Sequence, residues 1–307
     1  MKLERINTPK ELLERYKAYN CMLGLRVDGG AKNTTYEREI LVCGGTGCVS
    51  SDSSIIVDNL NAEIAKHGLS SKIQVIKTGC FGFCEKGPIV LVQPDNVFYT
   101  MVKPSDAAEI VDSHIVNGKR VERLLYEEPS MKQKIEKSKD MPFYKKQMRI
   151  ALRNCGIINP ENIMEYIAAD GYQALSKCLT EMDGDAVINH MKQSGLRGRG
   201  GGGFPTGVKW EAAKKFKSPE KFIICNADEG DPGAFMDRSI LEGDPCSVLE
   251  SMTIAGYAVG ADRGYIYIRA EYPLAIHRLQ IAIAQSREIG MLGKNILGSG
   301  FNFDIEL

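Results

Sequence analysis

Four cysteines form two closely spaced pairs whose thiols could bind a metal centre. Four residues separate Cys43 from Cys48, three separate Cys80 from Cys84, and residues 49–79 lie between the pairs. Each pair lies in a glycine-rich segment, and glycine permits the tight turns that thiolates need around a metal. The residue types and their spacing therefore predict a thiolate-ligated centre.

Two kinds of centre fit four thiolates, and the spacing favours one of them. Tetrahedral zinc more often uses Cys-x2-Cys pairs, whereas a [2Fe–2S] cluster has two irons to span and accepts wider pairs. The order differs from that of plant-type ferredoxins, and a thioredoxin-like redox disulfide would need Cys-x-x-Cys, which is absent. We expect a [2Fe–2S] cluster and electron transfer, with zinc as the alternative.

A glycine-rich loop at 195–210 is a second candidate site. Its first nine residues include six glycines, so the backbone can approach a flat ring or a phosphate closely. Arg197, Arg199 and Lys209 add positive charge for a phosphate, and Phe204 can stack on a ring. The pattern G-x-G-x-x-G is present, but helical residues precede it, so the ordinary Rossmann assignment fails. A flexible surface loop is the alternative.

An acidic turn at 226–233 follows an expected strand at 221–225. Carboxylates at the carboxyl end of a buried strand lie where open α/β sheets bind ligands. Asp228, Glu229 and Asp231 could accept hydrogen bonds from ribityl or ribose hydroxyls. A plain acidic turn would explain the Asp-Pro-Gly end of the segment, but it explains the preceding Asn-Ala-Asp-Glu less well.

The cysteine pairs belong to an expected small α/β module. In order, the sequence predicts strand 39–43, helix 54–67, strand 72–77, strand 88–94 and helix 106–117. Helical spacing puts Ile55, Ile56, Leu60 and Ile64 on one side of the first helix. Each cysteine pair follows a strand, and the order β-α-β-β-α is that of a compact α/β fold.

The rest of the chain is expected to form a linker and a second α/β domain. We predict a helical extension at 1–35 with a Gly29-Gly30 break, the α/β module at 36–126, a lysine-rich solvated linker at 127–149 and the second domain at 150–307. Its expected helices are near 160–179, 183–195, 244–260 and 271–288, and its strands at 221–225 and 264–269. Residues 301–307 alternate like a strand with no turn after it, which predicts that the second domain is cut short.

Composition restricts the possible functions. The 307 residues are 43% apolar and 25% charged with a formal net charge of zero, so no electrostatic footprint for nucleic acid is present. No apolar stretch is long enough to insert into a membrane, and the first residues lack an apolar signal core, which indicates a cytoplasmic protein. Nine cysteines in such a chain indicate metal or redox use, although single ones are usually small buried hydrophobes.

The two loop motifs resemble the NADH-binding flavoprotein subunit of respiratory complex I. The matching residues are Gly-Arg-Gly-Gly-Gly-Gly-Phe-Pro-Thr-Gly-Val-Lys-Trp at 198–210 and Asn-Ala-Asp-Glu-Gly-Asp-Pro-Gly at 226–233. The N-terminal module resembles the thioredoxin-like [2Fe–2S] domain of the same systems. Their fusion is similar to the diaphorase subunit of NAD(P)-dependent, electron-bifurcating iron hydrogenases, and the resemblance covers about residues 36–307.

The resemblance implies an α/β fold class, with an N-terminal thioredoxin-like [2Fe–2S] domain followed by an incomplete FMN/NADH-binding domain. The glycine loop would hold NAD(H), with Phe204 stacked on the adenine. The implied cluster ligands are Cys43, Cys48, Cys80 and Cys84. The implied cofactor-binding residues are Gly198, Arg199, Gly200, Gly201, Gly202, Gly203, Phe204, Pro205, Thr206, Gly207, Lys209, Asn226, Asp228 and Asp231.

Individual roles in the flavin site also follow from the resemblance. Lys209, Asn226 and Asp228 would contact FMN, and Glu229 would act beside the nicotinamide and the flavin as the catalytic residue. Asp231 stands where the family usually has glutamate, so its contact to the nucleotide would be shorter or weaker. The family continues with a Gly-Ala-Gly and Cys-Gly-Glu-Glu-Thr segment and a [4Fe–4S] domain, and neither is in this sequence.

The function implied by the resemblance is an NADH:acceptor oxidoreductase, or diaphorase, module. It would pass electrons between NAD(H), FMN and iron–sulfur clusters, with other iron–sulfur subunits of a hydrogenase or NADH dehydrogenase complex as partners. The alternative is an electron-carrier fragment that holds only the [2Fe–2S] cluster and does not oxidise NADH.

Overall fold

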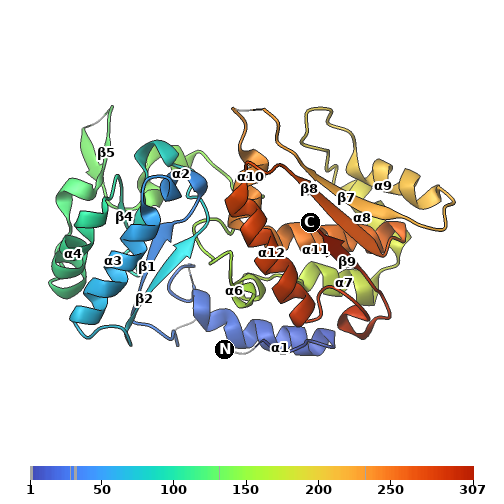
Figure 1. The fold of residues 1–307 in the computed structure, drawn as a ribbon, viewed down its shortest axis with the longest axis horizontal. Helices are drawn as coiled ribbons and strands as arrows, with labels where there is room; N and C mark the ends of the chain where they lie inside the picture. Colours follow the sequence, from blue (N-terminus) through green and yellow to red (C-terminus); the bar gives the residue numbers. More distant parts are fainter. Residues whose placement is uncertain (1–2, 28, 31–32, 131, 232) are drawn as a thin grey trace. The chain divides into compact units, whose positions relative to one another are not determined.

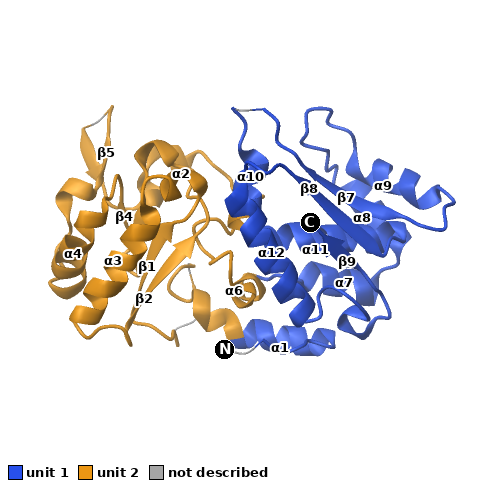
Figure 2. Cartoon of the chain, in the orientation of Figure 1, with its two compact units in different colours: residues 1–18, 170–241, 245–307 blue, residues 19–169, 242–244 orange. Residues whose placement is uncertain are grey.

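A computed structural model describes residues 3–27, 29–30, 33–130, 132–231 and 233–307. Contacts between Cα atoms divide the chain into two compact units (Figure 2). The first, called the ferredoxin unit below, comprises residues 19–169 and 242–244; the second, called the nucleotide unit, comprises residues 1–18, 170–241 and 245–307.

A four-stranded mixed sheet organises the ferredoxin unit (Figure 1). The strand order is β2-β1-β3-β4, and β1 pairs parallel with β2 and antiparallel with β3. The parallel pair needs a crossover, which helix α3 (Ser53–Lys66) supplies. The strands are β1 (Arg38–Cys43), β2 (Ile73–Thr78), β3 (Val90–Gln93) and β4 (Val97–Tyr99).

Helix α3 confirms the expected helix but corrects one of its residues. Ile56, Leu60 and Ile64 are buried in one core with residues of β1 and β3, as their spacing predicts. Ile55, expected on the same side, is 48% exposed. Adjacent residues of an α-helix point about 100° apart, so Ile55 and Ile56 cannot both face the sheet squarely.

The expected order β-α-β-β-α omitted strand β4. This strand has three residues, too few to show an alternating pattern, and it pairs antiparallel with β3 across a short turn. Asn96 in this turn has a φ of 56°, a left-handed conformation that asparagine tolerates. The last expected helix is confirmed as α4 (Ala107–Glu109), continued by a π-helical segment at Ile110–Val116.

Residues 127–149, expected to be a solvated linker, contain secondary structure. Strand β5 (Tyr126–Glu128) pairs antiparallel with β6 (Gln133–Ile135), and a short helix α5 (Pro142–Lys145) follows. Ile135 and Met141 are buried in the same core as Cys43 and Cys48. The segment is rich in lysine, but these two apolar side chains anchor it to the core.

The remaining short helices of the ferredoxin unit are η1 (Asn20–Leu23), α2 (Thr46–Val49), η2 (Cys84–Lys86), η3 (Pro104–Asp106), η5 (Glu122–Leu124), η6 (Ser138–Asp140) and α6 (Ile163–Ala168).

The nucleotide unit contains a three-stranded parallel sheet in the order β7-β8-β9. The strands are β7 (Phe222–Ala227), β8 (Arg263–Ile268) and β9 (Asp304–Glu306). Other elements are α1 (Pro9–Tyr19), α7 (Gln173–Glu181), α8 (Gly184–Gln193), α9 (Thr206–Lys215), α10 (Met236–Gly243), α11 (Pro245–Val259), α12 (Pro273–Glu288) and η7 (Ile296–Gly298). Among the described helices, none is long and apolar enough to cross a membrane.

The two faces of this sheet differ in burial. The strands β7, β8 and β9 follow one another in chain order across the sheet. Because crossovers between parallel strands are right-handed, the connecting helices α11 and α12 lie on the same face. Gly264 and Ile266 of β8 are accordingly buried. Ile224 and Tyr267, on the opposite face of β7 and β8, are 68% and 65% exposed. An exposed apolar face of this kind marks a candidate ligand or interaction surface.

Candidate functional site

The sheet of the ferredoxin unit brings the two cysteine pairs to one edge. Cys43 is the last residue of β1, and its register partner on the parallel strand β2 is Thr78, two residues before Cys80. Cys48 lies in the short helix α2, and Cys84 begins η2. Because β1 and β2 run in the same direction, the loops that follow them emerge side by side.

The four thiols form a connected row. Cys43 is hydrogen-bonded to both Cys48 and Cys80, and the Sγ atoms of Cys80 and Cys84 are 3.6 Å apart. The hydrogen bond to Cys48 raises the pKa of Cys43 to about 12, and the hydrogen bond to Cys43 raises the pKa of Cys80 to about 11. Cys48, which accepts from Cys43, has a lowered pKa. Metal binding would replace these thiol hydrogen bonds, since thiols ligate as thiolates.

The surroundings of the thiols fit a binuclear cluster. The backbone N–H of Gly82 donates to Cys80 Sγ over 3.2 Å, a contact that tunes thiolate ligands of iron–sulfur clusters. A Cβ added at Gly45 would lie 3.0 Å from the Cβ of Cys80. Within the described ranges, no three His, Cys, Asp or Glu residues are placed to hold a single metal ion. Four thiols in two pairs are a ligand set that a [2Fe–2S] cluster accepts.

The glycine at position 87 makes room for the sulfur of Cys48, and this leads to a prediction. A Cβ added at Gly87 would lie 2.7 Å from Cys48 Sγ, which is closer than real Cβ atoms approach a neighbour. We expect Gly87→Ala to displace the sulfur and to lower cluster occupancy by roughly tenfold, measured as bound iron per chain. Gly47→Ala is the control, because its Cβ would meet nothing within 4 Å; equal iron in both variants would contradict the prediction.

In the nucleotide unit, the glycine loop is closed at its base and open at its tip. The backbone N–H of Gly198 donates to the carbonyl of Phe204 over 2.9 Å, and the N–H of Thr206 donates to the carbonyl of Leu196 over 2.9 Å. A Cβ added at any glycine from 200 to 203 would meet nothing within 4 Å. The Phe204 side chain is 57% exposed. The tip therefore leaves backbone amides and one aromatic ring accessible to a ligand.

The end of the expected loop is helical. Helix α9 begins at Thr206, so Thr206, Gly207 and Lys209 belong to its first turn. A Cβ added at Gly207 would lie 2.6 Å from the backbone nitrogen of Lys192, so this glycine is explained by the packing of α9 on α8. The first-turn amides and the Lys209 ammonium are suited to a phosphate group.

The acidic turn presents polar side chains at the carboxyl end of β7. Asn226 and Asp228 are exposed, and the Asn226 side-chain oxygen accepts from the N–H of Asp228 over 3.1 Å. Asp231 is also exposed and accepts from the N–H of Gly233 over 3.0 Å. Among the described residues, no hydrogen bond joins this turn to the glycine loop. Asn226 is paired in register with Tyr267, an exposed aromatic residue that the sequence reasoning missed.

Glu229 differs from the other carboxylates of the acidic turn because it is buried and both of its carboxylate oxygens accept hydrogen bonds. Its two carboxylate oxygens accept from the backbone N–H groups of Asp237 and Arg238, over 3.0 and 3.2 Å, at the start of α10. The hydroxyl of Tyr272 donates to it over 3.2 Å. Burial, followed by the charge of Glu229, raises the pKa of Asp237. Arg269, which donates to the carbonyl of Glu229 over 2.8 Å, completes a cage that no motif in the sequence revealed.

Two families match separate parts of the chain. Residues 32–114 match the thioredoxin-like [2Fe-2S] ferredoxin family, and residues 191–306 match the Nuo51 FMN-binding domain. The first range contains all four cysteines of the row, and the second contains both the glycine loop and the acidic turn. The two matched ranges are thus similar to an iron–sulfur family and to an FMN-binding family.

Individual proteins are similar to parts of the chain. NADP-reducing hydrogenase subunit HndC of Solidesulfovibrio fructosivorans is 63% identical over 163 residues, covering 53% of this chain and 33% of that protein. The F 2 subunit of the NADH-quinone oxidoreductase of Rhizobium meliloti (strain 1021) is 47% identical over 158 residues, covering 52% and 38%. The thioredoxin-like [2Fe-2S] ferredoxin structure from Aquifex aeolicus is 33% identical, with a TM-score of 0.27, over 29% of this chain and 95% of that chain.

The chain therefore has a segment similar to Nuo51 FMN-binding domains and a segment similar to thioredoxin-like [2Fe–2S] ferredoxins on the same polypeptide. It spans about a third of the length of the curated relatives that it matches.

Proposed function

We propose that the protein transfers electrons between NAD(H) and iron–sulfur partner subunits. The observation that carries the proposal is the presence, on one chain, of a four-thiol row and of an accessible glycine loop in a unit with a parallel sheet. The names of the relatives, an NADP-reducing hydrogenase subunit and NADH-quinone oxidoreductase subunits, support it. The partners would be iron–sulfur subunits of a hydrogenase or of an NADH dehydrogenase complex, and the location would be the cytoplasm.

The chain's own residues would bind and orient the carriers. Bound FMN would supply the conversion between a two-electron hydride and single electrons, which a [2Fe–2S] cluster held by the four cysteines accepts. Phe204 and the open glycines would hold the adenine nucleotide, while Lys209 would bind phosphate. Asp228 would accept hydrogen bonds from flavin hydroxyls, and the Asn226 amide would donate to them or accept from them. Glu229, held by two backbone amides, would present a fixed negative charge beside the nicotinamide.

The test is anaerobic quantification of iron and flavin on the purified protein, together with NADH–ferricyanide activity. Two irons, bound FMN and NADH-dependent ferricyanide reduction are expected. Two irons without FMN or activity would replace this proposal by the electron-carrier fragment that holds only the cluster. An absence of both iron and flavin would overturn both hypotheses.

The exposed ring of Phe204 allows a specific test of nucleotide binding. We expect Phe204→Ala to raise the KM for NADH by roughly 5- to 150-fold with little change in kcat, because stacking of a base on an aromatic ring contributes about 1–3 kcal/mol. Phe216→Ala, at the end of α9 and 71% exposed, is the matched control. An unchanged KM in Phe204→Ala would remove the stacking role.

A further inference from the structure

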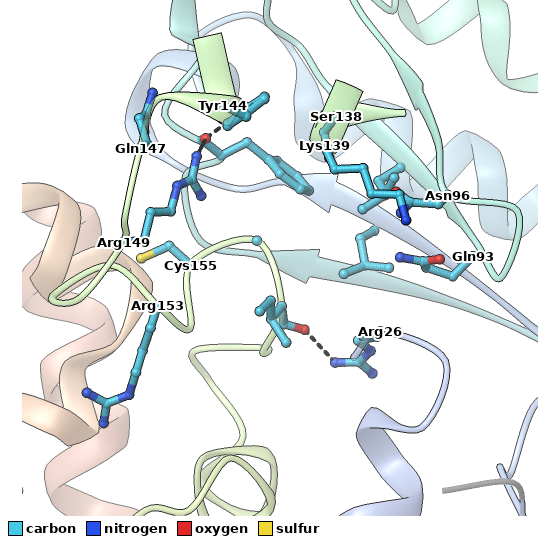
Figure 3. Close-up of a pocket in the computed structure, with 15 residues that line it drawn as sticks. Arg26, Gln93, Asn96, Ser138, Lys139, Tyr144, Gln147, Arg149, Arg153 and Cys155 are labelled. Atoms are coloured by element: carbon cyan, nitrogen blue, oxygen red, sulfur yellow. Dashed lines mark hydrogen bonds between the residues drawn. The ribbon is translucent and has the colours of Figure 1, made fainter. Parts of the chain in front are cut away.

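A segment outside both family matches holds the loop between Cys80 and Cys84. The Tyr144 hydroxyl donates to the carbonyl oxygen of Phe81 over 3.0 Å, and the Arg149 guanidinium donates to the same oxygen (Figure 3). The matched ranges end at residue 114 and resume at residue 191, so neither includes Tyr144 or Arg149. Two donors from one segment thus converge on one carbonyl next to a cluster ligand.

The position of Arg149 is well defined by its neighbours. Its guanidinium carbon lies 4.9 Å from the centroid of the Tyr144 ring, a cation–π contact. Gly82 has a φ of +80°, and a Cβ there would come within 3.3 Å of Arg149 Nη2. The same Gly82 donates its N–H to Cys80 Sγ over 3.2 Å. Arg149 therefore contacts the peptide segment that supplies a hydrogen bond to a ligand sulfur.

The charge of Arg149 is not neutralised by a carboxylate. No ion pair to Arg149 occurs within the described residues, and it lines a pocket of about 400 Å³ together with two further cations, Lys139 and Arg153. Arg26, also at this pocket, is by contrast paired with two glutamates. Burial raises the pKa of Tyr144, so its hydroxyl keeps the proton that it donates to Phe81.

We propose that Arg149, together with Tyr144, is a positioning residue that raises the reduction potential of the [2Fe–2S] cluster. Reduction adds one negative charge to the cluster, and a nearby fixed cation stabilises that charge. The contacts of Arg149 and Tyr144 with the Phe81 carbonyl also hold Gly82 where its N–H reaches the Cys80 sulfur. The inference rests on the cluster part of the proposed function and is independent of NADH oxidation.

The experiment is a mediated redox titration of the intact protein, with the reduced cluster monitored by EPR. We expect Arg149→Gln to lower the equilibrium constant for reduction of the cluster by about tenfold. This corresponds to a midpoint potential lower by ~59 mV for one electron. Arg149→Lys, which keeps the charge, should restore most of the midpoint potential. Lys146→Gln removes the same charge from an exposed residue of the same segment and should leave the midpoint unchanged.

The outcomes separate a tuning role from a structural one. A wild-type midpoint in Arg149→Gln, or an equal shift in Lys146→Gln, would overturn the proposal. If Arg149→Gln fails to assemble its cluster, Tyr144→Phe decides, since it removes only one hydroxyl donor. Tyr144→Phe should lower the equilibrium constant for reduction of the cluster two- to threefold. An unchanged midpoint potential would refute the role of the Phe81 contact. If the wild-type protein does not oxidise NADH, that result concerns the nucleotide site, and the midpoint shift of Arg149→Gln still decides this proposal.

Discussion

Replacement of Cys43 by alanine is expected to abolish the iron–sulfur cluster while leaving most of the chain folded. Cys43 is the central thiol of the row, hydrogen-bonded to both Cys48 and Cys80. It ends strand β1 and is 1% exposed, so no water or neighbouring side chain can take the vacated ligand position easily. With three thiolates left for two irons, we expect at least a tenfold decrease in bound iron. Iron analysis and the EPR signal after dithionite reduction measure the loss.

A second cysteine provides the control for this variant. Cys178 in α7 is also buried, but it packs with Val187, Ile188 and Ala258 in the other unit and has no part in the row. Cys178→Ala should therefore keep full iron content. If Cys43→Ala retained two irons and the wild-type EPR signal, the assignment of the four cysteines as cluster ligands would be wrong.

The second large effect concerns the stability of the ferredoxin unit. Arg26 donates to both oxygens of Glu39, over 2.8 and 2.9 Å, and to Glu165 over 2.5 Å. The three side chains are 1–5% exposed. Burial opposes the charge of Arg26, but its hydrogen bond to Glu39 and the charge of Glu165 raise its pKa. Removing the cation leaves two buried carboxylates unpaired, so we expect Arg26→Met to lower the free energy of unfolding by about 3–5 kcal/mol.

Two further variants show whether burial is the cause. Arg123 pairs with Asp106 and Glu109, but its side chain is 53% exposed, so Arg123→Met should cost less than about 1 kcal/mol. The triple variant in which Arg26, Glu39 and Glu165 all become methionine should recover much of the loss, since no unpaired charge remains. Chemical denaturation measures all three. A cost for Arg26→Met no larger than that for Arg123→Met would contradict the prediction.

The sequence alone predicted those features that depend on residues close together along the chain. The spacing of the two cysteine pairs, the glycine loop and the acidic turn were all recognised from local patterns, because thiolate ligation and tight turns require particular residue types at fixed offsets. The expected strands followed from short apolar runs and, at 72–77, from alternation, and the structure confirms β1, β2 and β3. Strand β4 was not predicted, because three residues are too few to show an alternation of apolar and polar side chains.

Composition misled where a segment has few but decisive apolar residues. Lysines dominate 127–149, and a charge-rich stretch is typical of a solvated linker. Packing depends on individual side chains rather than on the average, and Ile135 and Met141 are buried beside the cysteines. The same segment provides Tyr144, whose contact with Phe81 no pattern along the chain could have revealed.

Only the tertiary structure decided which residues far apart in sequence contact one another. Arg26 meets Glu165 across 139 positions, Arg149 reaches Phe81 across 68, and Tyr272 reaches Glu229 across 43. From sequence alone, a charged or polar side chain is expected at the surface, because its burial without a hydrogen-bonding or ionic partner is costly. The partner of a buried polar side chain is known only from the folded structure. The sequence by itself therefore predicted the chemistry of the cysteine row, of the glycine loop and of the acidic turn. The fold decided which distant charges and donors surround them.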